Sequence, residues 1–437
     1  MLRTRDGTGH DVRLPLRGVR VLELSSVFMA PYSAQVLSDW GADVVKVEPP
    51  EGDTVRAINQ VEGNGLGPIF VTANRGKRSI VLDLKTDTGL EALYRLVRRS
   101  DVLMHNVRPA AAQRLGIDAR SLRAINPELV HCAFRGYGDG GPYAELPAYD
   151  DVIQAATGVA AAQASDGSPP GYWRSAAADK IVGLYGAAAI SAALHARAVS
   201  GVGSAIEVPM FETMASFMLL DRQGGWVAYP PNGPTGYART DSRYRRPHRT
   251  SDGYLAVLIY TDRHWRRFFA AIGKDHLADD PRFSTIEGRT KAIDELYRLV
   301  EDELRIRSTE DCERLLLAAD IPHGPVNSID DLFADPHLSE TQFFHVLEQP
   351  GLGPVRLARS PIDLGWPHVP PRPAPRLGEH TREVLEENGF GAPEVDGLLA
   401  SGAVRQMASV SSAADPGEGG DRPRRPPAEI DSISRPL

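Results

Sequence analysis

An aspartate at the start of a long segment of small residues is the first candidate for chemistry in this sequence. Asp179 opens the run DKIVGLYGAAAISAALHAR, whose alanines and two glycines, Gly183 and Gly186, predict a helix with a smooth surface for close packing. The positive end of a helix and its free backbone N–H groups stabilise a carboxylate, so we expect Asp179 to be ionised. An ionised carboxylate can act as a nucleophile in acyl transfer. Most aspartates at such positions only cap the helix, and a catalytic role therefore needs independent support.

The first strand–turn–helix unit has one feature of a dinucleotide-binding unit and lacks another. Its second strand, Ala42–Val47, is followed by Glu48, where a ribose-binding carboxylate would lie. The turn before the first helix reads LSSVFMAP and lacks the three glycines that allow close approach to a pyrophosphate. The sequence therefore argues against a nicotinamide enzyme, while a cleft above the strand ends could still hold another nucleotide.

Composition narrows the class of protein. The chain has 437 residues, with 49 Lys and Arg against 57 Asp and Glu, and this net charge of −8 argues against broad binding of nucleic acid or anionic membrane. The two cysteines, Cys132 and Cys312, lie far apart without metal-ligand neighbours, so we expect neither a disulfide nor a metal site. No signal-peptide pattern opens the chain, and Ile181–Val199 has the polar residues of a buried helix rather than a membrane span. We therefore expect a soluble, cytoplasmic protein.

The chemistry-bearing residues must be positioned by a layered α/β fold. Strand and helix patterns alternate over the first 135 residues and predict βαβ units with a mainly parallel sheet, whose ligands gather at the carboxyl ends of the strands. The expected strands are 17–24, 42–47, 79–84, 101–105 and 129–134, and the expected helices are 31–40, 88–98, 179–200, 209–220, 264–272, 290–304, 308–319 and 381–388. Changes in composition then divide the chain. The predicted parts are the first part of a large α/β domain (1–225), a linker (226–250), a small α+β domain (251–335), a linker returning to the large domain (336–408) and a disordered tail (409–437).

Several distinctive blocks follow one another from about residue 15 to 405. They include LRGVRVLELSSVFMAPYSAQVLSDWGADVVKVEPPEGD, NRGKRSIVLDLKTDTG, DVLMHNVRPAAAQRLGID, NPELVHCAFRGYGDGGPYA, DKIVGLYGAAAISAALHARAVSGVGSAIEVPMFE, IPHGPVN and PRLGEHTREVLEENGF. In these collinear blocks the chain resembles the class III coenzyme A-transferases, the family of formyl-CoA and carnitine CoA-transferases, which is related to the α-methylacyl-CoA racemases. The resemblance implies a Rossmann-like large domain built from both chain ends, an inserted small domain and an interlocked homodimer.

The resemblance also implies a role for Asp179, which matches the family's catalytic aspartate. In that family the aspartate attacks an acyl-CoA thioester and gives a mixed anhydride and free CoA thiolate. The thiolate then forms an aspartyl-CoA thioester, and an acceptor carboxylate takes over the CoA. CoA and acyl-CoA are substrates in this chemistry, and no permanently bound cofactor is implied.

Further positions match family residues that contact CoA. They are Ser26, Val27, Phe28, Met29 and Ala30 in the first loop, Leu82 and Lys85 after the third strand, Asn106, Val107 and Arg114 after the fourth, and Arg135 after the fifth. Lys and Arg suit the pyrophosphate and 3′-phosphate of CoA. Each of these residues also has an ordinary structural alternative, such as a solvated surface charge or a strand end.

Two departures from the family pattern bear on specificity. Formyl-CoA transferases carry a glutamine where this chain has Phe28, and they have a glycine-rich lid with no counterpart here. Related racemases carry a histidine where this chain has Tyr149, so only one of the two bases that racemisation needs is visible. A CoA-transferase is therefore preferred, and a racemase or isomerase of the same fold, or a non-catalytic CoA-binding homologue, stays open. The sequence leaves undetermined the acyl-CoA donor, the acid acceptor, the tail's role and whether the arginines of 239–249 bind substrate.

Overall fold

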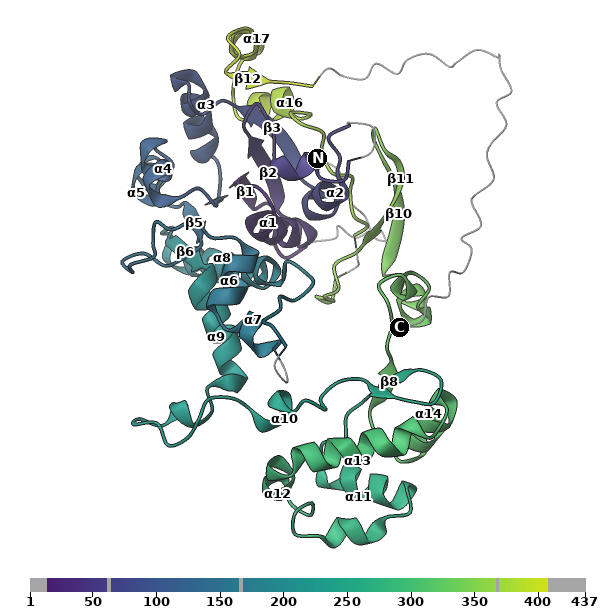
Figure 1. Ribbon diagram of the computed structural model, residues 1–437. Coiled ribbons are helices and arrows are strands. Elements are labelled where there is room, and N and C mark those ends of the chain that lie inside the picture. The colour runs from purple at the N-terminus through teal and green to yellow at the C-terminus, as the bar shows by residue number, and fades with distance from the viewer. Residues whose placement is uncertain (1–13, 61–63, 165–167, 367–368, 408–437) are drawn as a thin grey trace, which may run out of the picture.

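A seven-stranded sheet forms the centre of the larger part of the molecule (Figure 1). The computed structural model describes residues 14–60, 64–164, 168–366 and 369–407. The strand order is β12-β3-β2-β1-β4-β5-β6, and its pairings are parallel except that of β12 with β3. The strands are β1 (Arg20–Leu24), β2 (Asp43–Glu48), β3 (Arg78–Leu82), β4 (Val102–His105), β5 (Val130–Arg135), β6 (Ala205–Pro209) and β12 (Val404–Arg405). The predicted mixed α/β fold with a mainly parallel sheet is thus confirmed.

Both faces of this sheet are buried, which explains the continuous apolar runs of its strands. Val21 of β1 is in register with Val44 and Val102 and belongs to a core shared with α1 and α8. The next residue, Leu22, belongs to a second core on the opposite face, shared with α3, α16 and α17. The helices of this part are α1 (Met29–Asp39), α2 (Pro68–Asn74), α3 (Asp87–Val97), α4 (Pro109–Arg114), α5 (Ala119–Ile125), α6 (Asp150–Ala156), α7 (Val159–Ala162), α8 (Ala177–Ser200), α9 (Met210–Arg222), α16 (Thr381–Glu387) and α17 (Ala392–Ala400), with the 3₁₀ turns η1 (Thr54–Ala57) and η2 (Gly224–Val227).

Helix α8 packs on α1 and on β5 through its glycines. A Cβ atom on Gly183 would lie 2.7 Å from the carbonyl oxygen of Met29, and one on Gly186 would lie 2.3 Å from the ring of Phe134. By length and composition alone α8 could cross a membrane. In this fold its buried residues, among them Val182 and Ile190, belong to the core on the sheet face that α1 covers. The small residues that the sequence shows at this helix therefore set how closely α8 approaches α1.

A second group of elements lies apart from the large sheet in Figure 1 and has a core of its own. It contains the three-stranded antiparallel sheet β7-β8-β9 and several helices that surround Trp265, Phe268 and Leu296. Its elements are α10 (Ala238–Asp241), β7 (His248–Arg249), β8 (Tyr254–Val257), α11 (Asp262–Ala271), η3 (Asp275–Asp279), α12 (Ile286–Lys291), α13 (Ile293–Arg305), α14 (Thr309–Ala318) and β9 (His323–Pro325). The elements η4 (Asp331–Phe333) and α15 (Pro336–Glu340) follow, and Phe333 of η4 packs against Phe344 at the start of the next strand.

The chain returns to the large sheet through an antiparallel hairpin. The hairpin strands are β10 (Phe344–Gln349) and β11 (Gly353–Ala358), and they contribute Leu347 and Leu357 to a small core with Phe70 of α2. After α16 and α17 the two-residue strand β12 pairs with β3, so that Val404 lies opposite Leu82. Segments from both ends of the described chain therefore share one sheet.

Some predicted elements differ from the observed ones. The helix expected at 290–304 overlaps two observed helices, α12 and α13, which are divided at Ala292. The amide of Ala292 donates a hydrogen bond to the carbonyl oxygen of Gly288. Strands β6 and β12 were not predicted, because two to five residues at the sheet edges carry too little periodicity. The predicted tail, 409–437, lies outside the described residues, and the domain boundaries stay a prediction.

The close packing of α8 on β5 predicts a large effect of one methyl group. Gly186→Ala should lower the free energy of unfolding by about 1–3 kcal/mol, because the new methyl overlaps the Phe134 ring in a packed core. The matched control is Gly397→Ala in α17, where no atom of the described residues lies within 4 Å of the added Cβ. That substitution should stabilise the helix by roughly 0.5–1 kcal/mol. Thermal melts of both variants check this, and equal melting temperatures would contradict the packing described here.

Candidate active site

Two cavities lie at the carboxyl ends of the sheet strands. The first, called the aspartate cavity, has a volume of about 200 Å³ and is lined by Asp179, the loop Ser26–Met29, Arg108, Arg135 and Tyr149, among others. The second, called the strand-end cavity, has a volume of about 380 Å³ and is lined by residues that follow β1, β2, β3 and β4. This position is the one at which parallel α/β sheets bind ligands.

A pair of hydrogen bonds lies where the two cavities meet. Ser26 and Asn106 line both cavities. The Asn106 side chain accepts a hydrogen bond from the Ser26 amide (3.2 Å) and donates one to the Ser26 carbonyl oxygen (2.9 Å). The loop after β1 and the end of β4 are thereby joined at the boundary of the two cavities. One elongated ligand could occupy both cavities by passing this point.

Asp179 is the third residue of α8 and does not cap the helix. Its amide donates a hydrogen bond to the carboxylate of Asp150 (3.0 Å), the first residue of α6. The other oxygen of Asp150 accepts from the Gln154 side chain, and Gln154 also accepts from the Trp173 amide (2.9 Å). Asp150 therefore fills the capping position from another helix and leaves the Asp179 carboxylate free to face the cavity.

The electrostatics of Asp179 differ from the sequence expectation. Burial, together with the nearby negative charge of Asp150, raises the pKa of Asp179 to about 7. The sequence suggested that the start of the helix would favour the ionised form, but the Asp150 carboxylate already uses that end of α8. A partly desolvated carboxylate that is only half ionised near pH 7 is a stronger nucleophile once it loses its proton.

Most of the residues predicted to contact CoA lie at these two cavities. Ser26, Val27, Phe28, Met29, Asn106 and Arg135 line the aspartate cavity, and Ser26, Leu82, Lys85, Asn106 and Val107 line the strand-end cavity. The structure therefore brings together side chains that are more than 150 positions apart in the sequence, from Ser26 to Asp179.

Two predicted residues, Ala30 and Arg114, stand apart from this group. Ala30 is fully buried in the core between α1 and α8 and lines neither cavity, because the helix has already begun at Met29. Arg114 is exposed at the end of α4 and lines neither cavity, although its neighbour Leu115 lines the strand-end cavity. Arg135 lines the aspartate cavity and forms an ion pair with Asp139.

Sequence reasoning missed several residues at these cavities. Nothing in the sequence placed the carboxylate of Asp150, the residue after Tyr149, on the amide of Asp179. Arg108 lines the aspartate cavity, and Asp53 lines the strand-end cavity. The signal for Arg108 was its place two residues after Asn106 at the end of a strand. In the described part of the chain, no group of three or more His, Cys, Asp or Glu side chains is arranged to hold a metal ion.

Comparison with known proteins gives the family. A family model described as CoA-transferase family III matches residues 16–381. A succinate–glutarate CoA-transferase from Agrobacterium fabrum is 34% identical over 381 residues, covering 85% of this chain and 95% of that protein. A formyl-CoA:oxalate CoA-transferase from Streptomyces avermitilis is 31% identical over 411 residues, covering 89% of this chain and 99% of that protein.

Solved structures agree with this match. The fold is similar to that of a CAIB/BAIF family protein from Brucella suis, with a TM-score of 0.71 and 32% identity, over 86% of this chain and 99% of that one. A hypothetical protein from Mycobacterium tuberculosis gives a TM-score of 0.73 and 27% identity, over 85% of this chain and 99% of that one. The resemblance drawn from the sequence blocks is confirmed, and the chain belongs to CoA-transferase family III and is a CoA-transferase.

Proposed function

We propose that this protein moves CoA from an acyl-CoA thioester to a free carboxylic acid through covalent intermediates on Asp179. The observation that carries the proposal is the position of Asp179 in a cavity that meets the strand-end cavity at Ser26 and Asn106. The nucleotide part of CoA would occupy the strand-end cavity, beside Lys85. Its pantetheine arm would pass Asn106, and the thioester would then face Asp179.

The proposed steps exchange acyl groups without water or redox chemistry. An oxygen of Asp179 attacks the thioester carbon, the carbon–sulfur bond breaks, and a mixed anhydride and CoA thiolate result. The thiolate attacks the aspartyl carbonyl, which releases the donor acid as a carboxylate and leaves an aspartyl-CoA thioester. The acceptor carboxylate attacks this thioester, and the released thiolate attacks the acceptor's acyl carbon, which restores Asp179. Each step uses a carboxylate or thiolate as nucleophile and leaving group.

The names of the relatives suggest which acids to test first. The similar proteins are named for succinate and glutarate, for succinyl-CoA and mesaconate, and for formyl-CoA and oxalate. Most of these acids carry two carboxylates, and Arg108 and Arg135 would supply positive charge near a distal carboxylate in the aspartate cavity. We therefore propose a dicarboxylic acid as one substrate, with succinyl-CoA as the first donor to test.

We also propose that the protein works as a homodimer. Large apolar side chains are exposed on α8 and α9 and just after them, including Leu184, Leu220 (88% exposed) and Trp226. Such a surface is typical of an interface between subunits. The cytoplasmic location inferred from the sequence stays a prediction.

A racemase or isomerase of the same fold is less favoured by the site. A second base must be free to take a proton from the α-carbon. Asp150 is the carboxylate next to Asp179, and its two oxygens accept from the Asp179 amide and from Gln154. Incubation of an acyl-CoA in deuterated water distinguishes the two functions, since a racemase would place deuterium at the α-carbon and a transferase would not.

Removal of the Asp179 carboxylate should abolish transfer. We expect Asp179→Asn and Asp179→Ala to lower kcat with succinyl-CoA and glutarate by at least about 10³-fold, since covalent catalysis would be lost. The matched control is Asp87→Asn, an exposed aspartate in the first turn of α3 that lines neither cavity, and it should leave kcat unchanged. Retention of substantial transfer by Asp179→Ala would overturn the assignment.

The raised pKa of Asp179 predicts a pH-dependent effect on stability. In the unfolded chain an aspartate titrates near about pH 4, whereas burial raises the pKa of Asp179 to about 7 in the folded protein. The raised pKa therefore has no effect on the free energy of unfolding below about pH 4, lowers it progressively as the pH rises, and has its full destabilising effect above about pH 7. Asp179→Asn should melt above the wild type at about pH 8, and the two melting temperatures should converge as the pH falls to about 4. A constant difference across this range would contradict the raised pKa.

The Asp150 charge should shift the pH dependence of catalysis. Because Asp179 must be ionised to attack, kcat/KM should rise with pH through about 7. Asp150→Asn keeps an oxygen that can accept from the Asp179 amide but removes the negative charge, so the pKa of Asp179 should fall and the rise in kcat/KM should move to lower pH. An unchanged profile in this variant would show that Asp150 does not set the ionisation of Asp179.

A further inference from the structure

The loop that lines both cavities contains an unusual backbone conformation. Val27 has a φ angle of +73°, in the left-handed region that favours glycine. A β-branched side chain rarely adopts this conformation, and it persists only where neighbouring groups hold it. Val27 lies between Ser26, which lines both cavities, and Phe28, which lines the aspartate cavity. The strained residue, Val27, is therefore part of the wall of the aspartate cavity.

Asp53 holds Val27 in this conformation. One carboxylate oxygen of Asp53 accepts hydrogen bonds from the amides of Val27 (3.2 Å) and Val55 (3.2 Å). Its other oxygen lies 3.0 Å from the Nζ atom of Lys46. Asp53 is only 4% exposed, so water does not compete strongly for these contacts.

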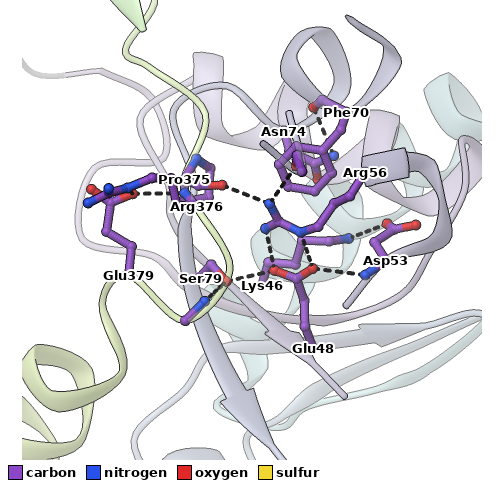
Figure 2. A network of polar contacts seen from close by, with 12 residues as sticks. Lys46, Glu48, Asp53, Arg56, Phe70, Asn74, Ser79, Pro375, Arg376 and Glu379 are labelled. Atoms are coloured by element: carbon purple, nitrogen blue, oxygen red, sulfur yellow. Dashed lines mark hydrogen bonds and ion pairs between the residues drawn. The ribbon is translucent and has the colours of Figure 1, made fainter. Parts of the chain in front are cut away.

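A buried network fixes Asp53 in turn (Figure 2). The amide of Asp53 donates to Glu48 (3.0 Å), and Glu48 is bound by the two-pronged guanidinium of Arg56 at 2.8 and 2.7 Å and by Ser79 at 2.6 Å. Lys46 lies between Asp53 and Glu23 and also donates to the carbonyl oxygen of Ser25 (2.8 Å). The Asp53 carboxylate cannot turn away from Val27 without breaking several of these contacts.

The loop in turn lies next to the nucleophile. A Cβ atom on Gly183 would be 2.7 Å from the carbonyl oxygen of Met29, so α8 touches the end of the loop at this glycine. Asp179 and Gly183 are four residues apart and therefore lie on the same face of α8. A change in the Val27 backbone would shift the cavity wall formed by Phe28 and Met29 relative to the Asp179 carboxylate.

We propose that Asp53 is a positioning residue of the transferase, which acts by holding the left-handed backbone of Val27 and so shapes the cavity wall beside Asp179. This inference rests on the proposed function of Asp179. It assigns to Asp53 a part in acyl transfer besides its part in the buried network.

The experiment compares Asp53→Asn, Asp53→Ala and the double variant Asp53→Ala with Val27→Gly in the full-length protein. Transfer is followed with succinyl-CoA and glutarate, and the Kd of free CoA is measured by calorimetry. A shift of the wall by less than an ångström should lower kcat of Asp53→Ala about 10–100-fold, while the Kd of free CoA changes about threefold or less. Glycine adopts a positive φ without strain, so Val27→Gly should restore at least about fivefold of the lost kcat.

The matched control is Ser79→Ala, which removes one hydrogen bond to Glu48. The two bonds from Arg56 still hold Glu48, and Asp53 keeps its contacts with Val27 and Lys46. It should lower the melting temperature and leave kcat unchanged. The proposal is overturned if Asp53→Ala has the kcat of Ser79→Ala, if glycine at position 27 restores nothing, or if only the Kd of free CoA changes. The last result would mean that Asp53 acts as a wall of the strand-end cavity instead.

A readout without turnover separates this inference from the proposed function. Amide hydrogen exchange of the peptide covering residues 24–31 should speed up at least about tenfold in Asp53→Ala, but not in Ser79→Ala, because only the first variant releases the Val27 amide. A wild-type protein without transfer activity would refute the proposed function. Unchanged exchange in Asp53→Ala would refute the role of Asp53 whether or not the protein transfers CoA.

Discussion

Charges buried without access to water constrain the rest of this structure. Lys46 is fully buried between Glu23 and Asp53, at 3.1 and 3.0 Å, and Arg56 is paired with buried Glu48. Each such ion costs several kcal/mol of hydration, which only close partners can offset, so the groups have very little freedom to rearrange. The loop after β1 is bonded directly to this cluster through Ser25 and Val27.

The site forms where this fixed loop meets a helix of small residues. Glycines in α8 let it approach α1 and the end of the loop, and this contact places Asp179 beside the loop. Burial raises the pKa of the Asp179 carboxyl, and the negative charge of Asp150, which uses the end of α8 that would otherwise stabilise this carboxylate, raises it further. Packing thus positions the Asp179 side chain, and desolvation raises its pKa. Both effects suit the proposed role of Asp179 as a nucleophile.

The sequence predicted the parts of this arrangement that depend on local pattern. Apolar runs placed β1, β2 and β4 to within a few residues, and the small residues after Asp179 predicted α8. The left-handed Val27 could not be predicted, since β-branched residues avoid that conformation and the carboxylate that holds it lies 26 positions away. The pairing of Asp150 with the Asp179 amide spans 29 positions, and the return of β12 to β3 involves two residues, so neither leaves a periodic signal.

The central claim is that Asp179 becomes covalently attached to acyl or CoA groups during turnover, and peptide mapping tests it most directly. The protein is incubated with succinyl-CoA, treated with hydroxylamine, digested and examined by mass spectrometry. Hydroxylamine converts an aspartyl thioester or anhydride into a hydroxamate, so we expect one modified residue, Asp179, and only in the samples that contain succinyl-CoA. A hydroxamate on another carboxylate, or an unmodified Asp179 in a protein that is transferring CoA, would contradict it.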